Sequence, residues 1–165
     1  MTADYIVSSL PALSLEAPPP ISWERFVEFS GLREADLSAW KDLETQLRNA
    51  AAEARAGDTS FNRPAEGCSL YWKSRVAACF READVAKRDL LIDKVWWDAA
   101  GELTPSWSPL GRGAIATYAI RLRLVLKRAK ISKEAGSAAF EKMAGATDAD
   151  FLQSVQNKAK ADTKK

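Results

Sequence analysis

Asp89 and Asp93 are the residues of this sequence whose types and spacing could do chemistry. They lie four residues apart, so on a helix both carboxylates would lie on the same side. Paired carboxylates bind divalent metal ions or transfer protons, but only with a pocket around them. Lys87, Arg88 and Lys94 are interleaved with the pair, and mixed charges of this kind are typical of a solvated helix face. We therefore interpret the pair as surface charge, and we expect neither a metal site nor a cofactor.

The sequence contains no histidine and only two cysteines, Cys68 and Cys79. The absence of histidine excludes or badly weakens the usual zinc sites and the Ser–His or Cys–His nucleophilic pairs. On one helix the two cysteines would lie about 16 Å apart, too far for a disulfide, and we expect buried reduced thiols. The Gly-Arg-Gly stretch at 111–113 is too short for a phosphate-binding loop. We therefore predict a protein that is not an enzyme, with no catalytic residues.

The chain has 165 residues, of which 47% are hydrophobic and 28% charged, a composition typical of a soluble globular domain. No apolar run is long enough to span a membrane. The first residues lack the basic region of a signal peptide, and Asp4 and Pro11 interrupt them. We expect a cytoplasmic protein, which a complex could place at the surface of the inner membrane.

Hydrophobic residues recur at helical spacing along most of the chain, and no stretch alternates as a strand would. The element predicted at 68–99 is either one helix buried on two sides or two helices with a break near Asp89. We predict an all-α fold, an irregular bundle of five or six helices in a single domain over residues 1–165. A Pro-rich segment occupies 1–21 and a basic flexible tail 157–165. The other elements are a short extended or helical start at 4–10 and helices at 23–29, 34–56, 114–130, 133–143 and from 147 onwards.

The stretch YAIRLRLVLKRAKI, from Tyr118 to Ile131, mixes apolar and basic residues almost one for one. It could form a membrane-surface helix, a nucleic-acid-binding helix or a core helix with solvated edges. The stretch has two apolar faces, whereas a membrane-surface helix has only one, so the pattern argues against a membrane-surface helix. The two apolar faces predict a core helix whose basic side chains reach solvent along both edges. The broad face comprises Ile115, Tyr118, Ala119, Leu122, Val125, Leu126 and Ala129, and the narrow one Ile120, Leu124 and Ile131.

The basic edges of this helix are candidates for contact with a partner. Contacts from these edges to phosphates are the basis of an alternative hypothesis, a basic helical nucleic-acid-binding protein. The edges are narrow and lack the interleaved aromatic residues that stack on bases, so we do not expect nucleic acid as the partner. The candidate contact residues on the edges are Arg121, Arg123, Lys127 and Arg128.

Trp107 is a fifth candidate contact residue. It lies between two serines in a proline-flanked loop, whereas Trp40 and Trp72 fall on helical apolar stripes and are expected in the core. A loop tryptophan either packs back onto the helices, which is the commoner outcome, or forms a hot spot for a protein partner.

Two long stretches resemble one family. The first is DYIVSSLPALSLEAPPPISWERFVEF (4–29), and the second is TYAIRLRLVLKRAKISKEAGSAAFEKM (117–143). Both are similar to an uncharacterised bacterial family encoded beside the genes of V-type (A/V-type) ATP synthases. The resemblance implies an all-helical protein equivalent to the adaptor of the central stalk, which connects the rotor shaft with the membrane ring. Its partners would be stalk or membrane-ring subunits. The resemblance implies no catalytic residues.

Charge is unevenly distributed along the chain. Residues 1–60 contain 5 basic and 10 acidic side chains, whereas residues 101–165 contain 12 and 6. An acidic front and a basic back indicate either complementary charges within the chain or a polarised contact surface, which would orient the protein between differently charged partners. The absence of catalytic chemistry, together with what the resemblance of the two stretches implies, leads to our leading hypothesis: a non-enzymatic interaction protein, an accessory or stalk-adaptor component of a bacterial V-type ATP synthase. A nucleic-acid-binding protein is the alternative, and an enzyme built on carboxylates is the weakest hypothesis of the three.

Overall fold

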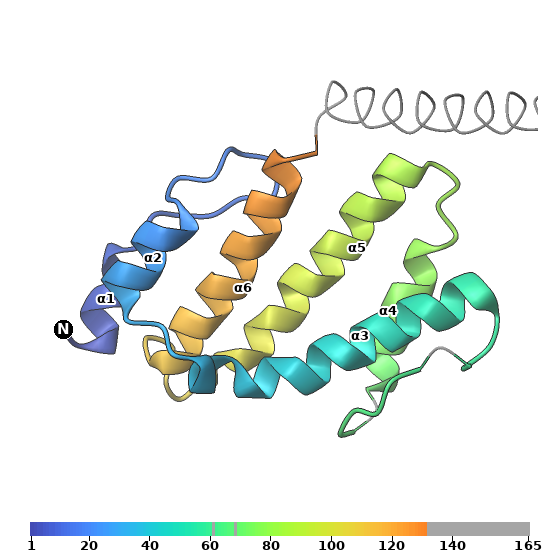
Figure 1. The fold of residues 1–165 in the computed structure, drawn as a ribbon, viewed down its shortest axis with the longest axis horizontal. Coiled ribbons are helices and arrows are strands. Elements are labelled where there is room, and N and C mark those ends of the chain that lie inside the picture. The colour runs from blue at the N-terminus through green and yellow to red at the C-terminus, as the bar shows by residue number, and fades with distance from the viewer. Residues whose placement is uncertain (61, 68, 132–165) are drawn as a thin grey trace, which may run out of the picture. The chain divides into compact units, whose positions relative to one another are not determined.

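The computed structural model describes residues 1–60, 62–67 and 69–131. In these residues the fold is all-α, with six α-helices, two short 3-10 helices and no strand (Figure 1), which confirms the predicted fold class. Contacts group residues 1–126 into one unit and 127–165 into another. The helices predicted at 133–143 and from 147, and the tail at 157–165, lie outside the described residues. The elements are α1 (Ala3–Ser9), α2 (Trp23–Ser30), η1 (Glu34–Leu37), α3 (Ser38–Ala56), α4 (Leu70–Cys79), α5 (Val85–Ala100), η2 (Gly101–Leu103) and α6 (Arg112–Ala129).

Local signals set the ends of α2 and α3. The Ser22 hydroxyl accepts a hydrogen bond from the Arg25 N–H at 3.3 Å and caps the start of α2. Gly31 and Gly57 end α2 and α3 in the left-handed conformation, with φ of 56° and 75°. Helix α3 begins at Ser38, four residues after the predicted start, because Glu34–Leu37 form the tighter turn η1.

The element predicted at 68–99 is two helices, and the break lies at 80–84, before the expected position at Asp89. The Asp84 carboxylate accepts hydrogen bonds from the N–H groups of Ala86 and Lys87 at 2.9 and 3.1 Å, so it starts α5 as an N-cap.

Cys79 is a buried free thiol, as expected, and burial raises its pKa. Cys68 lies outside the described residues.

Helix α6 is buried on two sides, as its two apolar faces predict, but Ile131, which the spacing assigns to the narrow face, lies beyond the end of the helix and is 62% exposed. Ile115, Ala119 and Leu122 pack with Ile6 of α1 and Phe26 of α2 in one hydrophobic cluster. Ile120 belongs to a second cluster, which also contains the following buried side chains: Trp40, Leu47, Ala50, Ala51, Trp72, Val76, Cys79, Val95, Ala99 and Ala100. In Figure 1, α6 lies between α2 and α5, and α3 runs from near the lower end of α5 across α4.

An ion pair joins the start of α6 to the turn between α2 and α3. The Asp36 side chain is only 6% exposed, and it forms a two-point ion pair with Arg112, whose Nε lies 3.1 Å from its Oδ1. The Arg112 guanidinium also donates to the backbone oxygens of Ser30 and Gly31 at 3.4 and 3.0 Å, at the end of α2. The hydrogen bonds from Arg112 hold the pKa of Asp36 well below its usual range. We call this arrangement the Asp36–Arg112 clamp.

The first turns of α6 also lie very close to η2 and the end of α5. The buried Thr117 hydroxyl donates to the Ala100 carbonyl oxygen at 2.8 Å and lies 2.7 Å from the Thr104 hydroxyl. A Cβ atom at Gly113 would overlap the carbonyl oxygen of Leu103. Glycine at 113 is therefore required by the close approach of two backbones.

We predict that Gly113→Ala lowers the free energy of unfolding by about 2–3 kcal/mol, because α6 must move away from η2 to accommodate the methyl group. Gly101→Ala is the matched control, since its new Cβ would meet only the Arg121 guanidinium, at an ordinary 3.5 Å. Urea unfolding of both variants measures the difference. Equal stability of the two variants would contradict the close approach.

We predict that Asp36→Asn lowers the free energy of unfolding by about 2–3 kcal/mol at pH 7, because it removes a charge-assisted pair from a largely buried site. The lowered pKa of Asp36 makes the wild-type contribution complete above the unfolded pKa of about 3.9. This contribution is lost as the pH falls below that value. The difference between wild type and Asp36→Asn should therefore shrink in acid. Unfolding from pH 7 to pH 2 tests this, with the exposed Asp89→Asn as a control whose effect stays small.

Candidate partner-contact surface

Trp107 is 85% exposed on a hydrogen-bonded turn, and it does not pack back onto the helices. The Ser108 N–H donates to the Pro105 oxygen at 2.9 Å, and the Gly111 N–H donates to the Ser108 oxygen at 3.2 Å. Leu110, on the same turn, is 41% exposed. The turn therefore exposes two large apolar side chains to solvent on a hydrogen-bonded backbone, and exposed aromatic side chains of this kind are available for contact with a protein. We call residues 105–111 the Trp107 turn.

Arg121 lies on the edge of α6 that faces α5. Its Nε donates to the Trp97 carbonyl oxygen at 3.1 Å, and its guanidinium lies 4.9 Å from the centre of the Trp97 ring. Burial lowers the pKa of Arg121 and the negative charge of Asp98 opposes this, but a guanidinium stays protonated at neutral pH. Arg121 is thus a fixed, partly buried positive charge.

Arg123 lies on the edge of α6 towards α2. Its guanidinium lies 4.5 Å from the centre of the Trp23 ring, so a tryptophan of a neighbouring helix supports each of the two arginines. Lys127 is exposed and Arg128 half-buried, and both belong to the second unit. Contacts within the chain therefore hold both Arg121 and Arg123 in place. That the five candidate residues contact a partner protein stays a prediction.

A groove connects Arg121 with the loop of the Trp107 turn. It has a volume of about 490 Å³ and lies among α1, the segment after it, α5, η2 and α6. Sequence reasoning missed it, because its walls come from stretches more than a hundred residues apart. The closest signal is the pair Leu10 and Leu13 in the Pro-rich segment, which has no helical period to explain its apolar residues. The lining residues are Val7, Leu10, Pro11, Ala12, Leu13, Trp97, Gly101, Thr104, Pro109, Ala114, Thr117, Tyr118 and Arg121.

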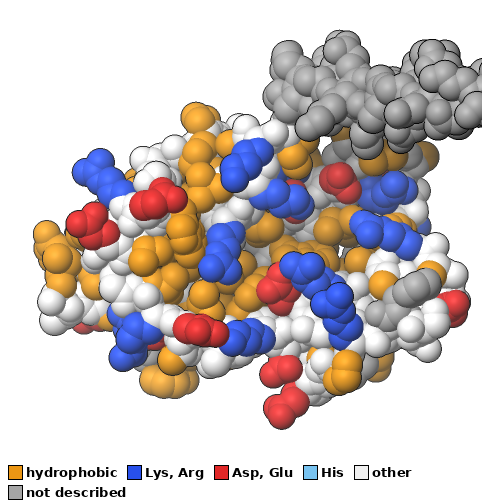
Figure 2. Space-filling view, in the orientation of Figure 1, with side chains coloured by type: hydrophobic (Ala, Val, Ile, Leu, Met, Phe, Trp, Pro, Cys, Tyr) orange, Lys and Arg blue, Asp and Glu red, His pale blue; other side chains and the backbone are white. Residues whose placement is uncertain are grey.

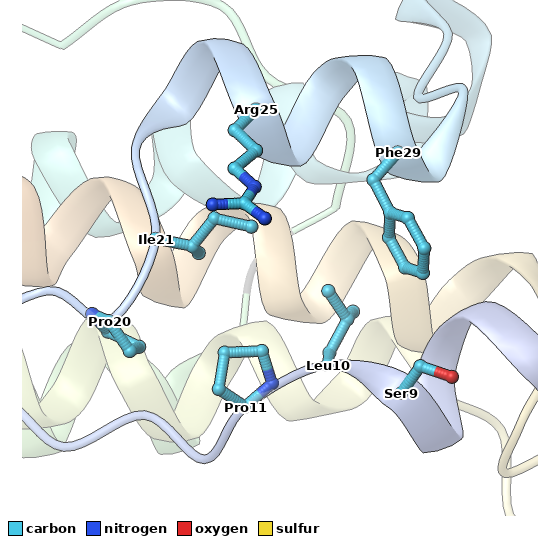
Figure 3. Close-up of a pocket in the computed structure, with 7 residues that line it drawn as sticks. All are labelled: Ser9, Leu10, Pro11, Pro20, Ile21, Arg25 and Phe29. Atoms are coloured by element: carbon cyan, nitrogen blue, oxygen red, sulfur yellow. The ribbon is translucent and has the colours of Figure 1, made fainter.

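A smaller groove of about 300 Å³ lies between the end of α1 and α2. In Figure 3, Arg25 and Phe29 extend from α2 towards Leu10 and Pro11, which also line the larger groove. Arg25 is exposed, and no side chain of the described residues forms an ion pair with it. The two grooves therefore share a wall and each contains one arginine.

The two aspartates considered for metal binding have different environments. Asp89 is exposed, as expected, but Asp93 is only 2% exposed, so its interpretation as part of a solvated face is wrong. The reason is its position on α5, because Asp93 precedes the buried Ala100 by two turns and lies on the same side of the helix. Within residues 1–60, 62–67 and 69–131, no three His, Cys, Asp or Glu side chains are grouped as metal ligands would be.

Basic side chains do not gather into one patch on the visible face of residues 1–126. Figure 2 shows Lys and Arg spread over this face and interspersed with Asp and Glu. Nucleic-acid-binding faces concentrate positive charge along a groove or stripe.

Among the described helices, none has both the length and the apolar character needed to cross a bilayer.

Comparisons of this chain with protein-family models, with curated proteins and with solved structures give no match.

Tyr118 fixes the Pro-rich segment that forms one wall of the larger groove. Its hydroxyl donates to the Pro11 carbonyl oxygen at 3.0 Å, and its ring stacks on Phe26 with 5.2 Å between ring centres. Burial raises the pKa of Tyr118 to about 12. The hydroxyl therefore keeps its proton in the folded protein at a pH where an exposed tyrosine loses it.

We predict that the protein loses stability between pH 10 and 12 and that Tyr118→Phe abolishes the part of this loss due to Tyr118. Above pH 10 the unfolded chain releases the phenol proton while the folded chain retains it, so rising pH favours unfolding. At pH 7 the variant should lose only about 1 kcal/mol, for one hydrogen bond. Unfolding curves at constant ionic strength measure both effects. The exposed Tyr5→Phe should retain the full alkaline loss.

Proposed function

We propose that this chain is a non-enzymatic helical interaction protein, an accessory or stalk-adaptor component of a bacterial V-type ATP synthase. The observation that carries an interaction function is the exposure of Trp107 on a hydrogen-bonded turn. The resemblance of 4–29 and 117–143 to the family encoded with these synthases supports the choice of partner. The partners would be stalk or membrane-ring subunits, which would place the chain at the inner membrane surface through the complex.

A mechanical role is consistent with the way the helices of residues 1–126 are joined. The Asp36–Arg112 clamp connects the end of α2 with the start of α6, and the bond from Thr117 to Ala100 connects α6 with α5. Such bonds between elements distant in sequence resist relative movement of the helices. A contact made at the Trp107 turn would therefore transmit force or position to the whole pack.

The partner is tested by affinity purification. The tagged protein is recovered from its native host at moderate salt after nuclease treatment, and its companions are identified by mass spectrometry. Stoichiometric recovery of V-type ATP synthase subunits is the expected result. Recovery of none, with binding that nuclease abolishes, would replace this function with nucleic-acid binding. In that case affinity should also fall steeply with salt, because phosphate contacts release counterions.

We predict that Trp107→Ala reduces the recovery of partner subunits at least tenfold, because an exposed hot-spot tryptophan contributes about 2 kcal/mol or more to binding. The free energy of unfolding should change little, since the side chain is 85% exposed. Tyr5→Ala is the matched control, as Tyr5 is 58% exposed on α1 and lies outside the turn. Equal loss of recovery in both variants would remove the special role of the Trp107 turn.

A further inference from the structure

The larger groove is lined mainly by apolar side chains, with the hydroxyl-bearing Thr104, Thr117 and Tyr118 among them, and it has a single positive charge. Val7, Leu10 and Leu13 line it from α1 and the segment that follows, and Trp97 and Pro109 line it from α5 and the Trp107 turn. Arg121 is the only charged residue among its lining residues. An occupant that matches both features has aliphatic groups and one negative charge.

Arg121 is prepared to bind a carboxylate. The Trp97 ring and the bond from Nε to the Trp97 carbonyl fix the guanidinium, so little side-chain freedom remains to be lost on binding. The terminal Nη donors of Arg121 have no hydrogen-bond or ion-pair partner in the described residues. A guanidinium with free donors binds a carboxylate through two parallel bonds. Partial burial strengthens such a pair relative to an exposed one.

We propose that this groove binds an extended segment of a partner protein in which one Asp or Glu is flanked by aliphatic residues, with its carboxylate on Arg121. This inference relies on the proposed function only in taking a protein as the partner. A protein segment fits better than a small molecule, because Pro109 of the groove belongs to the Trp107 turn. A chain that contacts Trp107 therefore reaches the groove along one continuous surface.

The neighbouring groove of Figure 3 provides the comparison. Arg25 also lies beside Leu10 and Pro11, but it is exposed, and no aromatic ring or carbonyl oxygen of the described residues fixes its guanidinium. It would lose more conformational freedom on binding than Arg121. The proposal therefore assigns the carboxylate to Arg121, and Arg25→Gln tests that assignment.

The experiment selects peptides without any knowledge of the natural partner. A phage-displayed library of random dodecapeptides is panned against the full chain, with Arg121→Gln as the counter-selection. The most enriched peptide is synthesised with a fluorescein label, and its binding is measured by fluorescence anisotropy. Enriched peptides should contain an Asp or Glu flanked by aliphatic residues. Replacing that acid by its amide should weaken binding about tenfold, the usual effect of a charge-assisted bidentate pair.

Variants of the chain locate the binding site. Arg121→Gln should weaken binding about tenfold, whereas Arg88→Gln, which changes an arginine of α5 that lies over the Phe80 ring and does not line the groove, should leave it within about twofold. Ala12 is exposed at the groove and belongs to neither hydrophobic cluster. Ala12→Asp should therefore weaken binding, and Ala12→Lys should strengthen it, without disturbing the fold. This pair of variants keeps the test decisive if Arg121→Gln is unstable.

Three results would overturn the proposal. One is a selection that yields no acidic, Arg121-dependent peptide. Another is loss of binding in Arg25→Gln with none in Arg121→Gln. The third is binding of free decanoate that depends on Arg121 while no peptide is selected, because it would make the groove a small-molecule site. No synthase subunit is present in this experiment, so its failure leaves the affinity-purification result standing, and the reverse also holds.

Discussion

Helix α6 has apolar side chains on two opposite sides, and the other helices of residues 1–126 cover both. Burying only the side with Ile115 and Leu122 would leave Ile120 in water, and each exposed side chain of this size costs about 2 kcal/mol. α1 and α2 cover one side of α6, while α3, α4 and α5 build the hydrophobic cluster that covers the other. Because both apolar sides of α6 must be buried, α6 lies between two groups of helices, α1 with α2 and α3 with α4 and α5. The two groups contact each other little.

Directional polar contacts further fix the position of a helix that lies between two groups, because hydrogen bonds depend more sharply on distance and angle than apolar contacts do. The Asp36–Arg112 clamp and the bond from Thr117 to Ala100 supply them near the start of α6. Arg112 is unfavourable at the first residue of a helix, where the helix dipole is positive, and the carboxylate of Asp36 offsets this. Gly113, one residue later, permits the close approach to Leu103. The Gly-Arg-Gly stretch, too short to bind phosphate, thus has a structural role.

The sequence predicts those features that depend on the residues of a single helix. Apolar spacing is a property of one helix, so it predicted the all-α fold and the double burial of α6. It does not predict contacts between residues that lie far apart in the chain. Asp36 and Arg112 are 76 residues apart, and nothing in the neighbours of either predicts their pairing. The break after Cys79 was placed too late because the capping residue Asp84 lies within a charged stretch that resembles a continuing helix. The positions of Arg121 and Arg123 on the edges of α6 were predicted from the sequence. Their contacts with the Trp97 and Trp23 rings were not, because these rings belong to other helices.

The two arginines on opposite edges of α6 show how similar residues acquire different roles. Each lies over a tryptophan of a neighbouring helix, and each therefore covers apolar surface with its guanidinium plane. Arg123 is exposed on its tryptophan, so water satisfies its remaining donors. Arg121 is half-buried beside the larger groove, where burial lowers its pKa because solvation of its charge is incomplete, and the charge of Asp98 opposes this only in part. An incompletely solvated cation gains more from a carboxylate than a solvated one does, since less hydration is lost when the pair forms. Periodicity places both arginines at the edges of α6, but only the packing around them makes Arg121 the stronger candidate for recognition.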